Sequence, residues 1–219
     1  MPYNKQNKLL FVHIPKTGGT SIEHYFEMDQ PDNFCFYRWD RDQVDFIEKH
    51  KHLTKSHKII YEPQHYPQNV LRDLIDNYQE YFKFTFVRNP YTKMLSEYYW
   101  LLNLQNQAPK NFDPRGFHEW CVEFLSNINS SHTEPQVSFI DDSIDFIGKF
   151  ENMEHDFNLL IEQLLSRKEQ LYLYQKKVLP FLNAVGRKKD LLLPYVFDKT
   201  RNLIFQTYRD DFKQFNYDY

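Results

Sequence analysis

Short apolar segments with β-strand character alternate along the chain with longer segments whose hydrophobic residues have a helical spacing. The segments with strand character are Leu9–Ile14, Lys58–Tyr61, Phe82–Val87, and the pair Val137–Ile140 and Asp145–Phe150, which supplies one or two more. The segments with helical character are Thr20–Met28, Gln43–Lys49, Asn69–Tyr78, Pro90–Leu104, Phe117–Ile128, Met153–Leu165 and a long tail, Tyr195–Phe215. Strands that alternate with helices favour a parallel sheet that is covered on both faces. We therefore predict an α/β fold of the P-loop-like, three-layer kind, with a central parallel sheet flanked by helices.

The first expected strand runs into a loop, His13–Ser21, that carries a lysine and two adjacent glycines. Ligands of parallel sheets bind at the carboxyl ends of the strands. The glycines let the backbone turn tightly, and the start of the next helix offers free N–H groups to an anion. Lys16 adds a positive charge, and Thr20 with Glu23 fits a capping box that would begin the helix. The pattern predicts an anion-binding loop, and an ordinary strand-to-helix turn with a surface lysine is the alternative.

The loop differs from a Walker A motif, because Lys16 precedes the glycines instead of following them. A second basic segment follows the strand expected at Phe82–Val87. There, Asn89 and Pro90 are favoured residues for the cap and the first position of a helix. Arg88 should therefore lie at the carboxyl end of the strand, where its forked guanidinium suits a phosphate. Ser96 lies about two turns into the helix and could face the same anion. A salt bridge for the arginine and a packing role for the serine are the alternatives.

Together, the Lys-Thr-Gly-Gly-Thr-Ser loop, the Arg-Asn-Pro segment and a serine eight positions after the arginine resemble the paired signature of sulfotransferases. The chain is most similar to the carbohydrate-type sulfotransferases (sulfotransferase family 2-like), whose loop typically reads His-Ile-Pro-Lys-Thr-Gly/Ala-Gly-Thr-Ser. The resemblance implies 3′-phosphoadenosine 5′-phosphosulfate (PAPS) as co-substrate, since its two anionic groups suit two anion sites. The residues that the resemblance assigns to the 5′-phosphosulfate are Lys16, Thr17, Gly18, Gly19, Thr20 and Ser21, and those that it assigns to the 3′-phosphate are Arg88 and Ser96.

The resemblance covers nearly the whole chain, and we expect residues 1–219 to form a single sulfotransferase domain. Asp145–Asn152 looks like the strand-to-helix segment that follows the family's substrate region, and Tyr208–Tyr217 looks like its closing helix. Leu182–Ala184 with Arg187 resembles a late loop that often gives the cofactor a further basic contact. A basic surface loop is the alternative for this segment.

The resemblance also implies a reaction, the transfer of the sulfuryl group from PAPS to an acceptor hydroxyl on a saccharide or glycan. By analogy with phosphoryl transfer, we expect in-line attack and catalysis by positioning and charge stabilisation. Lys16 would bind PAPS and stabilise the charge that develops on the leaving phosphate oxygen. His65 is the predicted catalytic base, because it follows the second expected strand, where sulfotransferases commonly place a catalytic histidine. Glu62 is the competing base, and His132 in the presumed substrate region also remains open.

No metal is expected at this site, because the charges of the leaving nucleoside bisphosphate would be met by basic side chains and backbone N–H groups. His50, His52 and His57 lie in a polar run, Lys49–Lys58, where no carboxylate or cysteine completes a metal-binding pattern. His13 lies within the first expected strand and is interpreted as structural. The sequence therefore predicts PAPS and the acceptor as ligands, without a metal.

Composition and charge narrow the class of protein further. The 219 residues carry a net charge of −3, which gives no basic field for nucleic-acid binding. The two cysteines, Cys35 and Cys121, are expected to be free thiols in a reducing compartment. The N-terminus has no signal-peptide pattern, and no run of about 18 apolar residues suggests a membrane span. We expect a cytoplasmic protein, or a catalytic domain cut free of an anchor.

Two other functions stay open at this level. A P-loop kinase acting on ATP would need a metal-binding acid at a strand end, and Ser138–Asp142 loosely resembles such an acidic strand. The position of Lys16, before the glycines, counts against a kinase. A nucleotide- or sulfate-binding module without catalysis would bind the cofactor and give no turnover. The acceptor and the oligomeric state are not predicted, although Phe34–Lys58 and Gln105–Asp142 are expected to shape the acceptor pocket.

Overall fold

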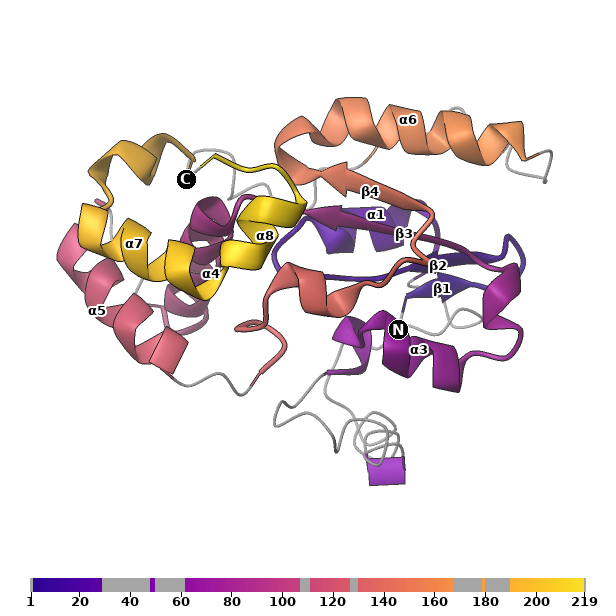
Figure 1. Ribbon diagram of the computed structural model, residues 1–219, viewed down its shortest axis with the longest axis horizontal. Coiled ribbons are helices and arrows are strands. Elements are labelled where there is room, and N and C mark those ends of the chain that lie inside the picture. The colour runs from indigo at the N-terminus through magenta and orange to yellow at the C-terminus, as the bar shows by residue number, and fades with distance from the viewer. Residues whose placement is uncertain are drawn as a thin grey trace.

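A sheet of mainly parallel strands forms the centre of the molecule (Figure 1). The computed structural model describes residues 2–28, 48–49, 62–106, 111–126, 130–167, 179 and 190–218. Within these ranges the strands, in their order across the sheet, are β1 (Tyr3–Asn4), β2 (Leu9–Phe11), β3 (Phe82–Val87) and β4 (Phe146–Lys149). β3 is parallel to both of its neighbours, and β1 is antiparallel to β2. The predicted α/β fold is confirmed, with one short antiparallel edge strand that the pattern did not predict. The strand expected at Lys58–Tyr61 lies outside the described residues.

The helices of the described ranges lie on both faces of this sheet and beyond one of its ends. They are α1 (Gly19–Tyr25), α3 (Gln68–Leu74), α4 (Pro90–Leu104), α5 (Pro114–Ser126), α6 (Met153–Ser166), α7 (Asp198–Thr207) and α8 (Arg209–Gln214). Short 3₁₀ helices are η1 (Pro63–His65), η2 (Tyr78–Glu80), η3 (Gln136–Phe139), η4 (Phe150–Asn152) and η7 (Asp190–Tyr195). Among these helices, none has both the length and the apolar character that crossing a membrane requires.

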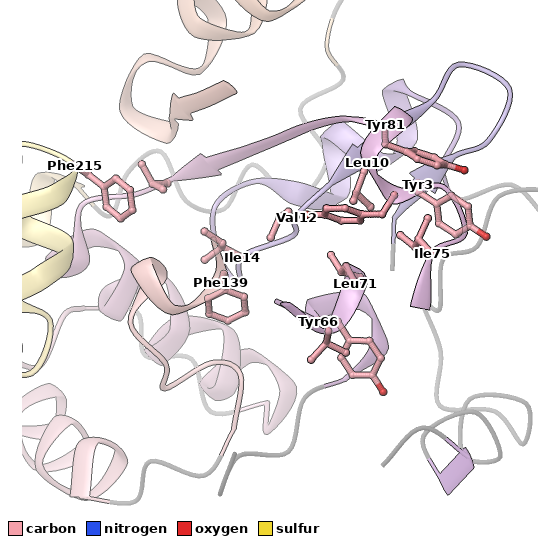
Figure 2. Close-up of a cluster of buried hydrophobic side chains, with 13 residues drawn as sticks. Tyr3, Leu10, Val12, Ile14, Tyr66, Leu71, Ile75, Tyr81, Phe139 and Phe215 are labelled. Atoms are coloured by element: carbon pink, nitrogen blue, oxygen red, sulfur yellow. The ribbon is translucent and has the colours of Figure 1, made fainter. Parts of the chain in front are cut away.

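Successive residues of β2 pack into cores on opposite faces of the sheet, because strand side chains alternate in direction. Leu9 and Phe11 belong to a cluster that includes residues of α1 and α6. Leu10 and Val12 belong to the cluster in Figure 2, which includes Leu71 of α3. Figure 1 shows α6 and α3 on opposite sides of the sheet. These clusters make the three layers that the sequence pattern predicted.

β3 is the central strand of this arrangement and is buried along its whole length. Its sequence, Phe-Lys-Phe-Thr-Phe-Val, combines aromatic and β-branched residues, which favour a strand that is covered on both faces. The one charged residue, Lys83, turns its Nζ to the carbonyl oxygen of Tyr81 at 2.7 Å and to the carboxylate of Asp145 at 3.4 Å. The hydroxyl of Thr85 donates to the carbonyl oxygen of Val12 at 2.7 Å, which ties β3 to the end of β2.

A third core lies beyond the carboxyl ends of β3 and β4, where α4, α5, α7 and α8 pack together (Figure 1). α4 begins immediately after β3. Asn89 caps this helix by accepting a hydrogen bond from the backbone N–H of Tyr91 at 2.9 Å, and Pro90 takes the first helical position. The predicted cap and both predicted ends of this helix are confirmed. The free thiol of Cys121 is buried in this core, and burial raises its pKa.

Three local predictions are wrong. Val137–Ile140 falls largely within the 3₁₀ helix η3, so Ser138–Asp142 is not the acidic strand that a kinase would need. The apolar residues of this segment are buried as a turn, with Phe139 fully inside the core of Figure 2. The C-terminal tail forms two helices, because it breaks at Tyr208 between α7 and α8.

The third wrong prediction is the capping box expected at the start of α1. The helix begins at Gly19 with Gly18 as its cap, and no side chain caps it. Glu23 points its carboxylate elsewhere: Oε1 lies 2.6 Å from Nδ1 of His13, and Oε2 accepts from Nε2 of Gln64 at 3.0 Å. Because this carboxylate is fully buried, its hydrogen bonds are made to the polar side chains beside it.

Candidate active site

The loop between β2 and α1 turns through two residues with left-handed backbone geometry. Lys16 has a φ of 67° and Gly18 a φ of 89°, and only glycine adopts the second without strain. At Gly19 a side chain would collide with the protein itself, since an added Cβ would lie 2.1 Å from Nε2 of His13. The two glycines are therefore required by the turn and by the histidine packed behind it.

The hydroxyl residues of the loop have different surroundings. Thr17 is fully buried, and its hydroxyl donates to the carbonyl oxygen of Ile14 at 2.8 Å, which closes the turn. Thr20 is half-buried, and Ser21 is buried with its N–H donating to the carbonyl oxygen of Gly18 at 3.2 Å. The side chain of Thr17 thus holds the loop in shape.

Arg88 meets this loop from the carboxyl end of β3. Its Nη1 donates to the carbonyl oxygen of Lys16 at 3.3 Å, and its Nε donates to the hydroxyl of Thr92 at 2.9 Å. The ring of Phe150 lies 4.0 Å from the guanidinium carbon, and only 1% of the residue is exposed. These three neutral groups orient the guanidinium toward the loop that carries Lys16. The structure therefore brings together the two basic segments that the sequence analysis singled out.

The backbone of Arg88 is fixed as firmly as its side chain. Gln136 of η3 accepts from the N–H of Arg88 at 2.8 Å and donates to its carbonyl oxygen at 2.7 Å. The side chain of Gln136 is fully buried and also lies against the carboxylate of Asp211 in α8. This chain of contacts connects the end of β3 to the C-terminal helix.

Ser96 lies on the face of α4 that is turned toward the loop. Residues four apart share a helix face, and Ser96 is four residues after Thr92, the partner of Arg88. It is also four residues before Trp100, whose ring lies 4.6 Å from Nζ of Lys16. Ser96 is buried between these two contacts. The other predicted cofactor contact, Arg187, lies outside the described residues.

Three histidine rings form a row next to the loop. The rings of His13 and His65 are 4.5 Å apart between centroids, and those of His65 and His132 are 5.3 Å apart. Nδ1 of His65 lies 2.8 Å from the carbonyl oxygen of His13, which can only accept, so Nδ1 carries the proton. Burial lowers the pKa of His65 well below its usual value, and the neighbouring His13 and His132 lower it further. His65 is thus held as a neutral imidazole with its lone pair on Nε2.

The outer histidine of this row, His132, is held by α4. Its Nδ1 lies 2.8 Å from Oε2 of Glu97, and its ring stacks on that of Trp100 at 5.3 Å. The ammonium of Lys93 donates to the backbone oxygen of His132 at 3.1 Å. Sequence analysis missed Glu97 and Trp100. The available signal was their spacing, because Lys93, Glu97 and Trp100 share one helix face.

The competing base, Glu62, has a different partner. Its carboxylate accepts a hydrogen bond from the hydroxyl of Ser131, which is fully buried. This bond ties the start of η1 to the segment that carries His132. Among the residues that the structure describes, no group of three or more histidine, cysteine, aspartate or glutamate side chains has an arrangement that could hold a metal ion.

The arrangement places two cations, a turn of fixed shape and a row of histidines at the carboxyl ends of parallel strands, where ligands of such sheets bind. It can hold an anion with two charged groups and can take up a proton beside them. The model of the family described as the Sulfotransferase family matches residues 2–218. No curated protein and no solved structure gives a significant match to the chain.

Proposed function

The chain belongs to the sulfotransferase family, and on that premise we propose that it transfers the sulfuryl group of PAPS to an acceptor hydroxyl on a saccharide or glycan. The contact between Arg88 and the loop of Lys16 is the observation that carries the proposal. Two basic segments, 72 positions apart along the chain, meet at one end of the sheet. PAPS has two separate anionic groups, and two adjacent cations fit it better than they fit a single small anion.

The residues proposed to hold PAPS follow from the motif positions. The 5′-phosphosulfate is assigned to Lys16, Thr17, Gly18, Gly19, Thr20 and Ser21, and the 3′-phosphate to Arg88 and Ser96, with Arg187 as a further contact. The side chain of Thr17 is already used by the carbonyl oxygen of Ile14, so its backbone is the part available to the ligand. The buried guanidinium of Arg88 acts in a region of low dielectric, which strengthens its attraction for a phosphate.

Lys16 and His65 are the proposed catalytic residues. PAPS supplies the sulfuryl group and leaves as adenosine 3′,5′-bisphosphate. His65 presents the lone pair of Nε2, because Nδ1 donates to the oxygen of His13, and it would take the proton of the attacking hydroxyl. The ammonium of Lys16 would stabilise the negative charge on the departing phosphate oxygen. Positioning by the loop and charge stabilisation by this lysine would supply most of the rate enhancement.

The test is a calorimetric titration of the full chain with adenosine 3′,5′-bisphosphate and, in parallel, with ATP–Mg²⁺. We expect micromolar binding of the bisphosphate, weaker binding of ATP–Mg²⁺, and loss of bisphosphate binding in Arg88→Ala. Lys213→Ala, which removes an exposed lysine of α8, is the matched control and should bind as the unmodified chain does. A preference for ATP–Mg²⁺ would overturn the proposal in favour of a kinase, and binding of neither ligand would also overturn it.

A further inference from the structure

A histidine–carboxylate pair lies beside the proposed base. The carboxylate of Glu97 is 2% exposed, and it lies 2.8 Å from Nδ1 of His132. We propose that the proton of the acceptor passes from His65 to His132, and that Glu97 is the positioning residue that orients this second histidine and offsets its charge. This inference rests on the proposed sulfuryl transfer and adds a proton path to it.

His65 is an unfavourable place for the proton to remain. The residue is buried at 7% exposure, and its ring is flanked by the rings of His13 and His132. Its neutral form can accept a proton, but the resulting imidazolium would be desolvated and would lie between two further basic rings. A neighbouring group that carries the charge at lower cost would therefore draw the proton away.

His132 has the partner that His65 lacks among the contacts described for it. Because a carboxylate only accepts hydrogen bonds, Nδ1–H of His132 donates to Glu97 and Nε2 has the lone pair. The rings of His65 and His132 stand perpendicular, at 89°, so that one ring meets the other edge-on. The side chain of His132 is 16% exposed, which gives the proton a route to solvent after each turnover.

The charges around this pair favour an ionised Glu97. Burial works against ionisation of this carboxyl, but His132, Lys16 and Lys93 outweigh it and hold the pKa of Glu97 below its usual value. Lys93 also donates to the backbone of His132, and Lys16 lies over the ring of Trp100, on which His132 stacks. Lys93 thus contacts the backbone of His132 and Lys16 contacts the ring of Trp100, whereas the carboxylate of Glu97 is in direct contact with a ring nitrogen of His132.

The proton balance of the step is complete without a further reactant. The acceptor oxygen forms a bond to sulfur while the bond from sulfur to the phosphate oxygen of PAPS breaks, and that electron pair leaves with adenosine 3′,5′-bisphosphate. The acceptor proton moves to Nε2 of His65 and then, through one bridging water molecule, to Nε2 of His132. The imidazolium of His132 is neutralised by Glu97 until the proton is lost to solvent.

The first test measures the pair without any acceptor. The carboxyl carbon of Glu97 is titrated by NMR in the full chain and in His132→Ala. Removal of the histidine should raise the pKa of Glu97, because burial is the largest influence on this carboxyl and would then act with less opposition. His155→Ala, which removes an exposed histidine of α6, should leave it unchanged. An unchanged pKa of Glu97 in His132→Ala would overturn the proposed pair.

The second test measures transfer from radiolabelled PAPS to chemically desulfated heparin. His132→Ala and Glu97→Gln should each lower kcat by about a hundredfold or more, without weakening the binding of adenosine 3′,5′-bisphosphate. Added imidazole should restore turnover to His132→Ala but not to Lys16→Ala, and Glu97→Asp should recover part of what Glu97→Gln loses. Glu123→Gln, on an exposed position of α5, is the control.

The outcomes separate the two proposals. Full activity in His132→Ala, or a loss that imidazole does not restore, would overturn the role of His132. Failure of the unmodified chain to bind the bisphosphate would overturn the proposed function instead, and the carboxyl titration would still decide whether His132 and Glu97 form the pair.

Discussion

The ring of His13 determines how the loop between β2 and α1 is packed. It lies between the ring of Phe11, at 5.3 Å between centroids, and that of His65, at 4.5 Å, while Glu23 holds its Nδ1. Its Nε2 edge faces Gly19. From the sequence, the glycines were explained by the tight turn that they allow in the backbone. The structure adds a second reason, because a buried histidine occupies the space of a side chain at Gly19.

Gly19→Ala should therefore destabilise the protein. The new Cβ would lie 2.1 Å from Nε2 of His13, and the ring is confined by buried neighbours, so we expect a loss of about 2 kcal/mol in the free energy of unfolding, as in other overpacked cores. Chemical denaturation measures it. Gly116→Ala is the control: this glycine lies within α5 and its new Cβ would meet mainly the end of the Asp113 side chain. A change there of no more than about 1 kcal/mol is expected, and equal losses in both variants would contradict the steric explanation.

The residues that were predictable at this scale are those with a local signal. Lys16 and Arg88 follow strands and precede helices, so their place at the end of the sheet could be deduced from the order of elements. Glu97 and Trp100 share a helix face with Lys93, but that spacing does not show their contact with His132, which lies 35 positions from Glu97. Only the folded chain shows that two of the histidines, His13 and His132, each have a buried carboxylate beside them.

At the scale of elements, β3 and α4 were predicted with both ends correct because their signals are local. An unbroken apolar strand leads into an Asn-Pro cap, and neither depends on distant residues. η3 was predicted wrongly because its apolar residues resemble a strand, while its position is set by long-range contacts. Asp211 of α8 accepts from the N–H groups of Gln136 and Val137 at 2.9 Å each. These bonds use the backbone groups that a sheet would have needed.

Asp211→Ala should detach α8 from η3. Two N–H groups would lose their acceptor at about 1–3 kcal/mol each, so we expect the free energy of unfolding to fall by about 2–6 kcal/mol. Because Gln136 also holds the backbone of Arg88, the affinity for adenosine 3′,5′-bisphosphate should fall as well. Denaturation and calorimetry measure the two effects. The neighbouring Asp210 is exposed, and Asp210→Ala should change neither quantity; an equal effect of both variants would argue against the anchoring role.

For the molecule as a whole, the sheet and the group of helices beyond it contribute different halves of the site. The sheet supplies the loop after β2 and Arg88 after β3, and α4 supplies Ser96, Glu97 and Trp100. Alternation of strands and helices was enough to predict the first half. In the second half, Ser96 was also expected near the anion because it lies about two turns into the helix. Glu97 and Trp100 depend on how α4 packs across the loop, which hydrophobic spacing does not determine. The histidine row lies where the two halves meet, and its burial should affect the stability of the whole chain.

That burial predicts how stability depends on pH. The pKa of His65 in the folded protein lies well below its usual value of 6.5, chiefly because the ring is buried. Below about pH 6.5 the unfolded chain therefore binds a proton that the folded protein does not, and the free energy of unfolding falls with falling pH by at most about 1.4 kcal/mol per pH unit for this group. Above pH 6.5 the contribution of His65 to the free energy of unfolding is complete and constant.

His65→Gln removes this titration, so the unfolding free energy of the variant should fall less steeply below pH 6.5 than that of the unmodified chain. His155→Gln, at an exposed position, should retain the full slope. Chemical denaturation at a series of pH values measures these slopes of unfolding free energy against pH. Identical slopes in the unmodified chain and in His65→Gln would show that His65 is protonated as readily in the folded protein as in the unfolded chain. That result would remove the reason for passing its proton to His132.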